Sequence, residues 1–181
     1  MKQEIIIAGF GGQGVLSLGK ILAYSGIMQG LEVTWMPSYG PEMRGGTANV
    51  TVVLSDSQIS SPIAHEYDTV VVLNQQSLDK FESHVKADGV LIYDPNGITH
   101  PPTRTDIEIY KVDATAQAAK MGNPRTFNMI VLGAMIQVSP NVTLENAYKG
   151  LEKSLPERLH KTLPANREAI QVGMEIVEKE R

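Results

Sequence analysis

The sequence predicts an α/β fold, namely a Rossmann-like three-layer domain with a mostly parallel sheet and helices on both faces. First, residues 4–8 form a largely β-branched run without polar alternation, which is typical of a strand buried on both faces. Second, a glycine-rich turn joins this run to an apolar helical segment. Third, strand-like and helix-like patterns alternate along the chain without a repeat or linker, so we expect one domain over residues 1–181.

The first unit of the chain has the pattern strand, turn, helix, strand. Residues 15–29 are apolar around most of the helix circumference and end near Gly30, as expected of a buried α-helix. Residues 31–36 are expected to form the second strand. Because crossover connections between parallel strands are right-handed, we expect these elements to form a parallel βαβ unit.

A turn-rich segment at residues 37–46 holds three glycines and two prolines in ten residues, so no strand or helix is expected to continue through it. Further strands are expected at 47–54, 69–74, 90–94 and 107–113, and further helices at 76–85, 126–138, 143–154 and 164–180. Asp113 is placed to cap another helix, which continues through Lys120. Residues 95–102 are expected to form an exposed connection.

Composition excludes several classes of function. The net charge of −4 and the isoelectric point near 5.6 argue against a nucleic-acid partner or an anionic membrane partner, which require a basic surface. The chain contains no cysteine, so it holds no disulfide, no Cys-ligated zinc and no iron–sulfur cluster of its own. The sequence shows neither a signal peptide nor an apolar stretch long enough to span a bilayer, and a cytoplasmic location is expected.

The glycine turn after the first strand has the spacing of a dinucleotide-binding fingerprint at Gly9, Gly11 and Gly14. A turn without side chains lets a phosphate approach the following helix N-terminus, where amide donors and the helix dipole favour anions. The alternative is that the glycines only make a tight turn that packs closely on the sheet. Gln13 argues for a ligand or partner, because its polar amide stands on a turn that opens a helix.

Two well-known interpretations of such a turn are not supported. A nicotinamide dehydrogenase needs an acidic residue at the end of the second strand, where this sequence has Trp35, Met36 and Pro37. A nucleoside triphosphatase needs Lys and a hydroxyl residue after the last glycine, where this sequence has Val15 and Leu16.

The loop after the second strand carries a second group of candidate residues. Because this loop and the glycine turn both follow the carboxyl ends of strands, we expect them at the edge of the sheet where ligands bind in such folds. Tyr39 offers a ring and a hydroxyl, Glu42 an acceptor, and Arg44 a planar fork suited to carboxylate or phosphate. The alternative is a surface ion pair on a rigid turn, which contributes little energy.

The two loops together resemble the gamma subunit of 2-oxoacid:ferredoxin oxidoreductases, and most of all that of the 2-oxoglutarate enzymes. The resemblance extends over essentially the whole chain and includes the helix that starts near Asn128 and Asn166 near the start of the last helix. It is carried by Gly9-Phe10-Gly11-Gly12-Gln13-Gly14 and Ser38-Tyr39-Gly40-Pro41-Glu42-Met43-Arg44-Gly45-Gly46.

The resemblance implies an enzyme complex that oxidatively decarboxylates a 2-oxoacid with coenzyme A, giving acyl-CoA, carbon dioxide and reduced ferredoxin. Thiamine diphosphate and magnesium are then held mainly by alpha and beta subunits. The iron–sulfur clusters are held by the beta subunit or by a ferredoxin-like delta subunit. The isolated chain is expected to be inactive, and to hold none of these cofactors alone. Its partners are expected to be those subunits, coenzyme A and, through the complex, ferredoxin.

The same resemblance implies that this chain orients the coenzyme A side of the reaction rather than performing acid–base or nucleophilic chemistry, so no residue is expected to be catalytic. Arg44 is the expected charged anchor and Glu42 its orienting partner, and Arg44→Ala is expected to raise the coenzyme A requirement of the assembled enzyme. The expected binding set is Gly9, Gly11, Gly12, Gln13, Gly14, Ser38, Tyr39, Gly40, Glu42, Arg44, Gly45, Gly46 and Asn128.

Two alternatives stay open, a stand-alone nucleotide-binding module and a scaffold subunit whose loops make only protein contacts. A metal site is not expected, because the histidines show no helical or sequential pairing. Asp94 belongs to an Asp-Pro-Asn-Gly turn at a strand end, with a ligand role as the alternative. The histidines are His65, His84, His100 and His160.

Overall fold

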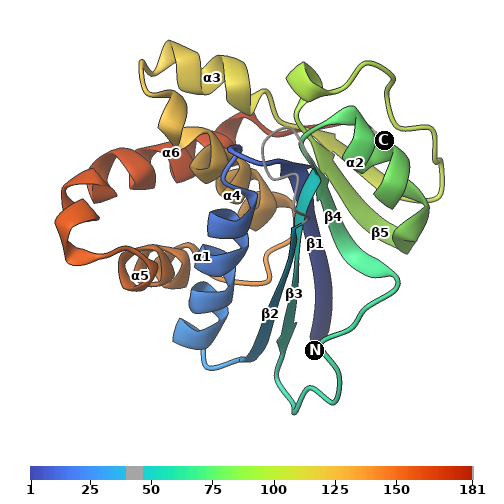
Figure 1. Cartoon of the computed structure of the whole chain (residues 1–181), viewed down its shortest axis with the longest axis horizontal. Coiled ribbons are helices and arrows are strands. Elements are labelled where there is room, and N and C mark those ends of the chain that lie inside the picture. Colours follow the sequence, from blue (N-terminus) through green and yellow to red (C-terminus); the bar gives the residue numbers. More distant parts are fainter. Residues whose placement is uncertain (40–46, 181) are drawn as a thin grey trace.

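A computed structural model describes residues 1–39 and 47–180 of the chain (Figure 1). The strands are β1 (Lys2–Phe10), β2 (Glu32–Tyr39), β3 (Thr47–Ser55), β4 (Tyr67–Val72), β5 (Val85–Tyr93), β6 (Glu108–Lys111) and β7 (Glu178–Lys179). The α-helices are α1 (Val15–Met28), α2 (Gln75–Phe81), α3 (Ala114–Lys120), α4 (Phe127–Val138), α5 (Leu144–Ser154) and α6 (Leu163–Ile176). Short 3₁₀ turns occupy Glu82–His84, Pro95–Gly97, Pro124–Thr126 and Glu157–Thr162.

The strands form one sheet in the order β2-β3-β1-β4-β5-β6-β7. The central strands β1, β4, β5 and β6 run parallel to one another, whereas β3 pairs antiparallel with both β1 and β2, and β7 pairs antiparallel with β6. The predicted α/β class is therefore confirmed. The expected parallel βαβ unit is wrong in one respect, because β3 inserts between β1 and β2 so that these two parallel strands are not neighbours.

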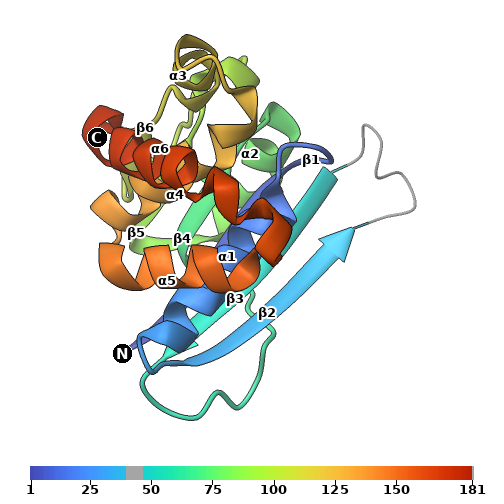
Figure 2. The ribbon, with the colours of Figure 1, turned by 90° about the vertical axis from the view of Figure 1, so that its left-hand side faces the viewer.

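Helices cover both faces of the sheet, as Figures 1 and 2 show. Alternate residues of β1 point into two separate cores, because Ile5 and Ile7 belong to one apolar cluster and Ile6 and Ala8 to the other. The larger core lies beneath α1, α4, α5 and α6, and the smaller core lies beneath α2. The prediction that the first strand is buried on both faces is confirmed.

Several predicted boundaries need correction. β2 extends through Pro37 and Ser38 to Tyr39, because pairing with β3 on one side stabilises residues that resemble a turn in local sequence alone. Proline is compatible with this position since β2 is an edge strand. The predicted last helix ends at Ile176, and the chain then forms β7 along the free edge of β6.

Side-chain capping matches the sequence at the start of α3. The Asp113 carboxylate accepts a hydrogen bond from the Ala116 amide at 3.3 Å, so the predicted cap of this helix is confirmed. The rest of α3 is short and rich in alanine, so the Asp113 cap is the clearest indication of this helix in the sequence.

An ion cluster lies at the amino ends of β1, β4 and β5. The Lys86 ammonium donates to Glu4 at 2.8 Å and to both oxygens of Asp68 at 3.0 Å. Burial raises the pKa of Glu4, but hydrogen bonds from Lys2 and Lys86 outweigh that effect and hold the pKa below its ordinary value. Because the pKa of Glu4 is lowered, this cluster stabilises the fold when the pH is above the ordinary glutamate pKa. The stabilisation is lost as the pH falls and Glu4 becomes protonated.

We therefore expect Lys86→Met to reduce the free energy of unfolding by about 1 kcal/mol at pH 7, a modest value because the cluster is partly exposed. The difference between variant and wild type should shrink as the pH falls below the ordinary glutamate pKa, and it should go on shrinking as the pH passes the lowered pKa of Glu4 in the folded chain. Urea unfolding at about pH 7 and about pH 3.5, on either side of the ordinary glutamate pKa, measures this. An equal difference at both pH values would contradict the assignment.

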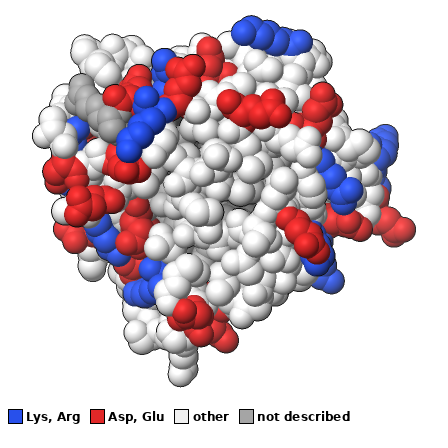
Figure 3. Space-filling model, turned by 180° about the vertical axis from the view of Figure 1, so that it is seen from behind, with Lys and Arg blue, Asp and Glu red and all other residues white. Residues whose placement is uncertain are grey.

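Charged side chains of both signs are interspersed around the margins of the face shown in Figure 3, and its centre is largely uncharged. This face therefore presents no continuous basic surface, which agrees with the net charge of −4. Among residues 1–39 and 47–180, none of the helices combines the length and the hydropathy of a transmembrane segment.

Candidate functional site

The glycine turn and the end of β2 lie at the same edge of the sheet. Gly9 pairs with Ala48, and Ala48 pairs on its other side with Tyr39. Because neighbouring strands are about 4.8 Å apart, the second candidate loop begins about 10 Å from the glycine turn. The prediction that both segments follow the carboxyl ends of strands at one edge is confirmed, although β3 separates them.

Part of the predicted site lies outside the described residues. This holds for Gly40, Glu42, Arg44, Gly45 and Gly46, whose predicted role therefore stays a prediction. Ser38 is part of the edge strand β2, where it pairs with Asn49. Ser38 does not line the pocket described below.

The glycine turn requires glycine at particular positions. Gly12 and Gly14 have φ angles of 99° and 73°, which side chains disfavour. Gly9 is required for its small size, because a Cβ atom there would lie 2.5 Å from the side-chain oxygen of Gln13 and 3.1 Å from Leu73. Gly11 lies in the turn itself and is half-buried. Backbone geometry thus accounts for Gly12 and Gly14, and packing accounts for Gly9, without a ligand.

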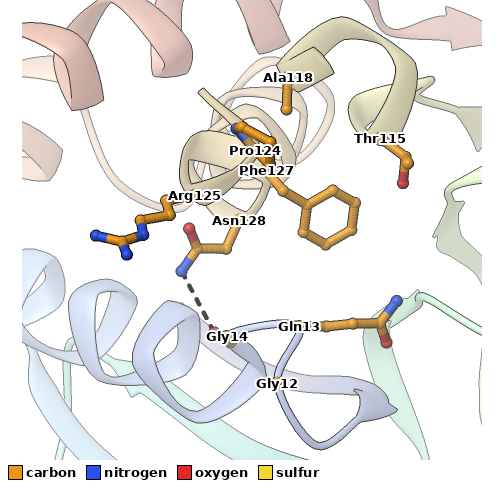
Figure 4. Close-up of a pocket in the computed structure, with 9 residues that line it drawn as sticks. All are labelled: Gly12, Gln13, Gly14, Thr115, Ala118, Pro124, Arg125, Phe127 and Asn128. Atoms are coloured by element: carbon orange, nitrogen blue, oxygen red, sulfur yellow. Dashed lines mark hydrogen bonds between the residues drawn. The ribbon is translucent and has the colours of Figure 1, made fainter. Parts of the chain in front are cut away.

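The Gln13 side chain is engaged within the chain. Its Oε1 atom accepts a hydrogen bond from the Phe10 amide at 2.6 Å, and its Nε2 atom donates to the Leu73 carbonyl at 3.0 Å. Figure 4 shows this side chain extending away from Asn128. Gln13 therefore fixes the glycine turn to the end of β4. One amide hydrogen and one lone pair of its oxygen are left for a ligand.

A pocket of about 350 Å³ lies beside the glycine turn, between the start of α1, α3 and the start of α4 (Figure 4). Asn128 spans the gap between α4 and the turn, and its Nδ2 atom donates to the Gly14 carbonyl at 3.5 Å, which is a long contact. The ring of Phe127 projects into the space between α3, α4 and the turn (Figure 4). The lining residues are Gly12, Gln13, Gly14, Thr115, Ala118, Pro124, Arg125, Phe127 and Asn128.

One side of this pocket favours an anion. The first turn of α1 carries no acidic residue, and its N-cap, Gly14, has no side chain to satisfy the free amides. Arg125 lines the same pocket, is exposed, and forms no salt bridge within the described part of the chain. A guanidinium and free helix amides together suit a phosphate or a carboxylate. The other side, with Ala118, Pro124 and Phe127, is apolar.

Of the predicted binding residues, Gly12, Gln13, Gly14 and Asn128 line this pocket together. Sequence reasoning missed the opposite wall, which comes from α3 and from the turn before α4. Arg125 precedes Asn128 by three residues in a segment that opens a helix, and this short spacing is the sequence feature that could have indicated Arg125 as a pocket residue. Phe127 gave no signal, because an aromatic residue at the start of an apolar helix usually belongs to the core.

Asp94 has a structural role in this fold. Its side chain is 1% exposed, and its carboxylate accepts hydrogen bonds from Asn96 and Thr115. Within residues 1–39 and 47–180, no group of three or more histidine or acidic side chains is arranged to hold a metal ion.

Residues 4–176 match the family model of pyruvate ferredoxin/flavodoxin oxidoreductase. The chain belongs to this family. It is 34% identical over 184 residues to the 2-oxoglutarate synthase subunit KorC of Methanothermobacter marburgensis, and the alignment covers 98% of this chain and 97% of the relative.

A second relative is longer than this chain. The ketoisovalerate oxidoreductase subunit VorA of Methanothermobacter thermautotrophicus is 36% identical over 172 residues, which are 95% of this chain. The aligned part is 36% of that relative, so this chain spans about a third of the length of VorA. In VorA, the domain is therefore part of a larger polypeptide.

Solved structures share the fold. The gamma subunit of a keto/oxoacid ferredoxin oxidoreductase from Geobacter sulfurreducens superposes with a TM-score of 0.83 and 30% identity, and the match covers 97% of this chain and 96% of that subunit. The 2-oxoglutarate:ferredoxin oxidoreductase of Magnetococcus marinus, solved with 2-oxoglutarate, coenzyme A and succinyl-CoA, gives a TM-score of 0.86 at 24% identity. That match covers 97% of this chain and 31% of the longer one, and it shows the common fold.

Proposed function

We propose that this chain is the gamma subunit of a 2-oxoacid:ferredoxin oxidoreductase complex. The complex would catalyse the coenzyme A-dependent oxidative decarboxylation of a 2-oxoacid to acyl-CoA and carbon dioxide, with reduction of ferredoxin. The proposal is supported by the family match over residues 4–176 and by relatives of similar length that are named as subunits of such enzymes.

The proposed role of this chain within the complex rests on the pocket at the glycine turn, which has two chemically different sides. One side, formed by the start of α1 and Arg125, suits a phosphate group. Its apolar side, which includes Phe127, suits a planar ring. Coenzyme A carries both kinds of group, and a pocket of about 350 Å³ would hold part of such a molecule.

The remaining chemistry is assigned to partner subunits. With no cysteine, the chain offers no thiolate ligand for an iron–sulfur cluster, so electron transfer to ferredoxin would proceed through other chains. Thiamine diphosphate, with its magnesium ion, would be held by alpha and beta subunits. The contribution of this chain is then binding, orientation and electrostatics, in a cytoplasmic complex that also contains a ferredoxin-like delta subunit.

We further propose 2-oxoglutarate as the 2-oxoacid. The support is the KorC relative, which is named for 2-oxoglutarate synthesis and aligns over 97% of its own length. A branched-chain 2-oxoacid is the competing substrate, supported by the higher identity to the VorA subunit, which is named for ketoisovalerate.

We expect Arg125→Ala to raise the KM for coenzyme A of the assembled enzyme about tenfold, the equivalent of one charge-assisted hydrogen bond of about 1.4 kcal/mol. The kcat value and the KM for the 2-oxoacid should stay close to wild type, because the chemistry is assigned to partner subunits. Steady-state assays of the purified complex measure these constants. Arg158→Ala is the matched control, because Arg158 is also exposed on a 3₁₀ turn but lies outside the pocket.

The scaffold alternative gives a different result. If the loops make only protein contacts, Arg125→Ala should leave all kinetic constants unchanged and weaken subunit assembly instead. The internal hydrogen bonds of Gln13 favour this alternative for the glycine turn. Arg125, which has no ion-pair partner within residues 1–39 and 47–180, favours a ligand. Measuring KM values and the yield of assembled complex in the same preparation separates the two.

A further inference from the structure

Helix α3 forms a wall of the pocket with few apolar contacts of its own. It has seven residues, and the side chains that it buries are those of Ala114 and Ala118. Alanine buries little apolar area, and helices shorter than about 12 residues are marginal without tertiary support. The position of α3, and so of Thr115 and Ala118 in the pocket wall, therefore depends on other interactions.

These interactions come from a group of four polar residues that we call the α3 clasp, namely Asp94, Asn96, Asp113 and Thr115. The Oδ2 atom of Asp94 accepts from the Thr115 amide at 3.0 Å and from the Thr115 hydroxyl at 2.6 Å. The Nδ2 atom of Asn96 donates to Asp94 at 2.8 Å and to Asp113 at 2.6 Å, so it links the two carboxylates. The clasp thus joins the carboxyl end of β5 to the first turn of α3.

Asp94 is the central member of the clasp. It is 1% exposed and is the one charged side chain among the buried residues of the described ranges. Its carboxylate accepts four hydrogen bonds from neutral donors of Asn96 and Thr115, two on each oxygen. A buried carboxylate is costly unless its oxygens are satisfied in this way, so all four donors must be in place.

We propose that Asp94 is a positioning residue, which holds α3 through Thr115 and thereby sets the affinity of the adjacent pocket for coenzyme A. The proposal rests on the proposed function of the pocket. Thr115 lines the pocket, but its hydroxyl donates its hydrogen to Asp94 and is left with acceptor capacity only. The α3 wall therefore disfavours an anion, which directs the phosphate groups toward Arg125.

The test uses Asp94→Asn and Thr115→Val in the assembled complex. An asparagine cannot replace Asp94 fully, because amide donors face both carboxylate oxygens and one of them would meet the NH₂ group. Thr115→Val keeps the shape and removes one hydrogen bond to the carboxylate. Hydrogen–deuterium exchange of residues 114–120 reports on α3, and the KM for coenzyme A reports on the pocket.

We expect amide exchange in α3 to rise about tenfold or more in both variants, and the KM for coenzyme A to rise with kcat unchanged. Thr115→Ser retains the hydroxyl, so amide exchange in α3 and the KM for coenzyme A should both stay close to their wild-type values. Thr143→Val is the matched control, since Thr143 caps α5 through the Asn146 amide and does not line the pocket. It should raise exchange in α5 alone and leave the KM for coenzyme A unchanged.

Two results would overturn the proposal. Unchanged exchange in α3 would show that the clasp does not hold the helix. Faster exchange in α3 without a change in KM, in a complex where Arg125→Ala does raise KM, would show that Asp94 is only structural. If neither Arg125→Ala nor Thr115→Val changes KM, the proposed function of the pocket fails, while the exchange data still decide whether Asp94 holds α3.

Discussion

Gly133→Ala is expected to lower the free energy of unfolding by about 3 kcal/mol, the upper part of the usual range for overpacking. Gly133 of α4 lies against the backbone of α6, where a Cβ atom would overlap the Ile170 carbonyl and lie 3.0 Å from the Met174 amide nitrogen. Backbone atoms inside a helix cannot rotate aside as a side chain can, so the two helices must separate. The gain in helix propensity from glycine to alanine, about 1 kcal/mol, offsets only part of this.

Chemical and thermal unfolding of the purified chain measures this effect, and a loss of about 3 kcal/mol corresponds to a fall in Tm of roughly 10 °C. Gln137→Ala is the control, because Gln137 is exposed on the same helix and its truncation adds nothing to the contact with α6. A Gly133→Ala variant as stable as Gln137→Ala would contradict the close packing of α4 on α6.

The second large effect is expected at the glycine turn. In Gly14→Ala, the new Cβ atom would lie 2.6 Å from Nδ2 of Asn128, in a backbone conformation with a φ angle of 73°. The strain should cost about 1–2 kcal/mol of stability. The displaced Asn128 should also alter the pocket, so we expect roughly a tenfold or greater loss in kcat/KM for coenzyme A in the assembled enzyme, or about 1.4 kcal/mol.

Gly12→Ala separates these two contributions. Gly12 also has a positive φ angle, but a Cβ atom there meets no other atom within 4 Å. Gly12→Ala should therefore show the stability loss with a much smaller change in kcat/KM. Equal kinetic effects in both variants would show that strain in the turn, rather than the position of Asn128, governs the pocket.

Local sequence patterns predicted much of this fold. The unbroken apolar run in β1 requires burial on both faces, and the structure provides a core on each side of Ile6 and Ile7. The start of α1 after the glycine turn follows from local chemistry, as does the Asp113 cap of α3. These features depend on neighbours within a few residues along the chain, which is why the sequence reveals them.

The features that were missed depend on contacts between distant segments. The place of β3 between β1 and β2 is decided by strand pairing, and an antiparallel neighbour leaves no mark on the sequence of the strand beside it. Arg125 joins the pocket because α4 packs beside α1, although Arg125 and Gly14 are far apart in the sequence. In the sequence, Asp94 resembles a simple turn residue. Its hydrogen bond to Thr115 joins two separate structural elements, so local sequence cannot reveal it.

The most direct measurement is to tag this chain in its native cell, purify it without oxygen and assay whatever is retained with it. We expect a brown complex with iron–sulfur absorbance, which reduces a viologen dye in a coenzyme A-dependent reaction with 2-oxoglutarate and more slowly with pyruvate or 2-ketoisovalerate. Preference for another 2-oxoacid would correct the substrate and keep the subunit assignment. A colourless chain that purifies alone and without such activity would contradict the assignment of this chain to such a complex.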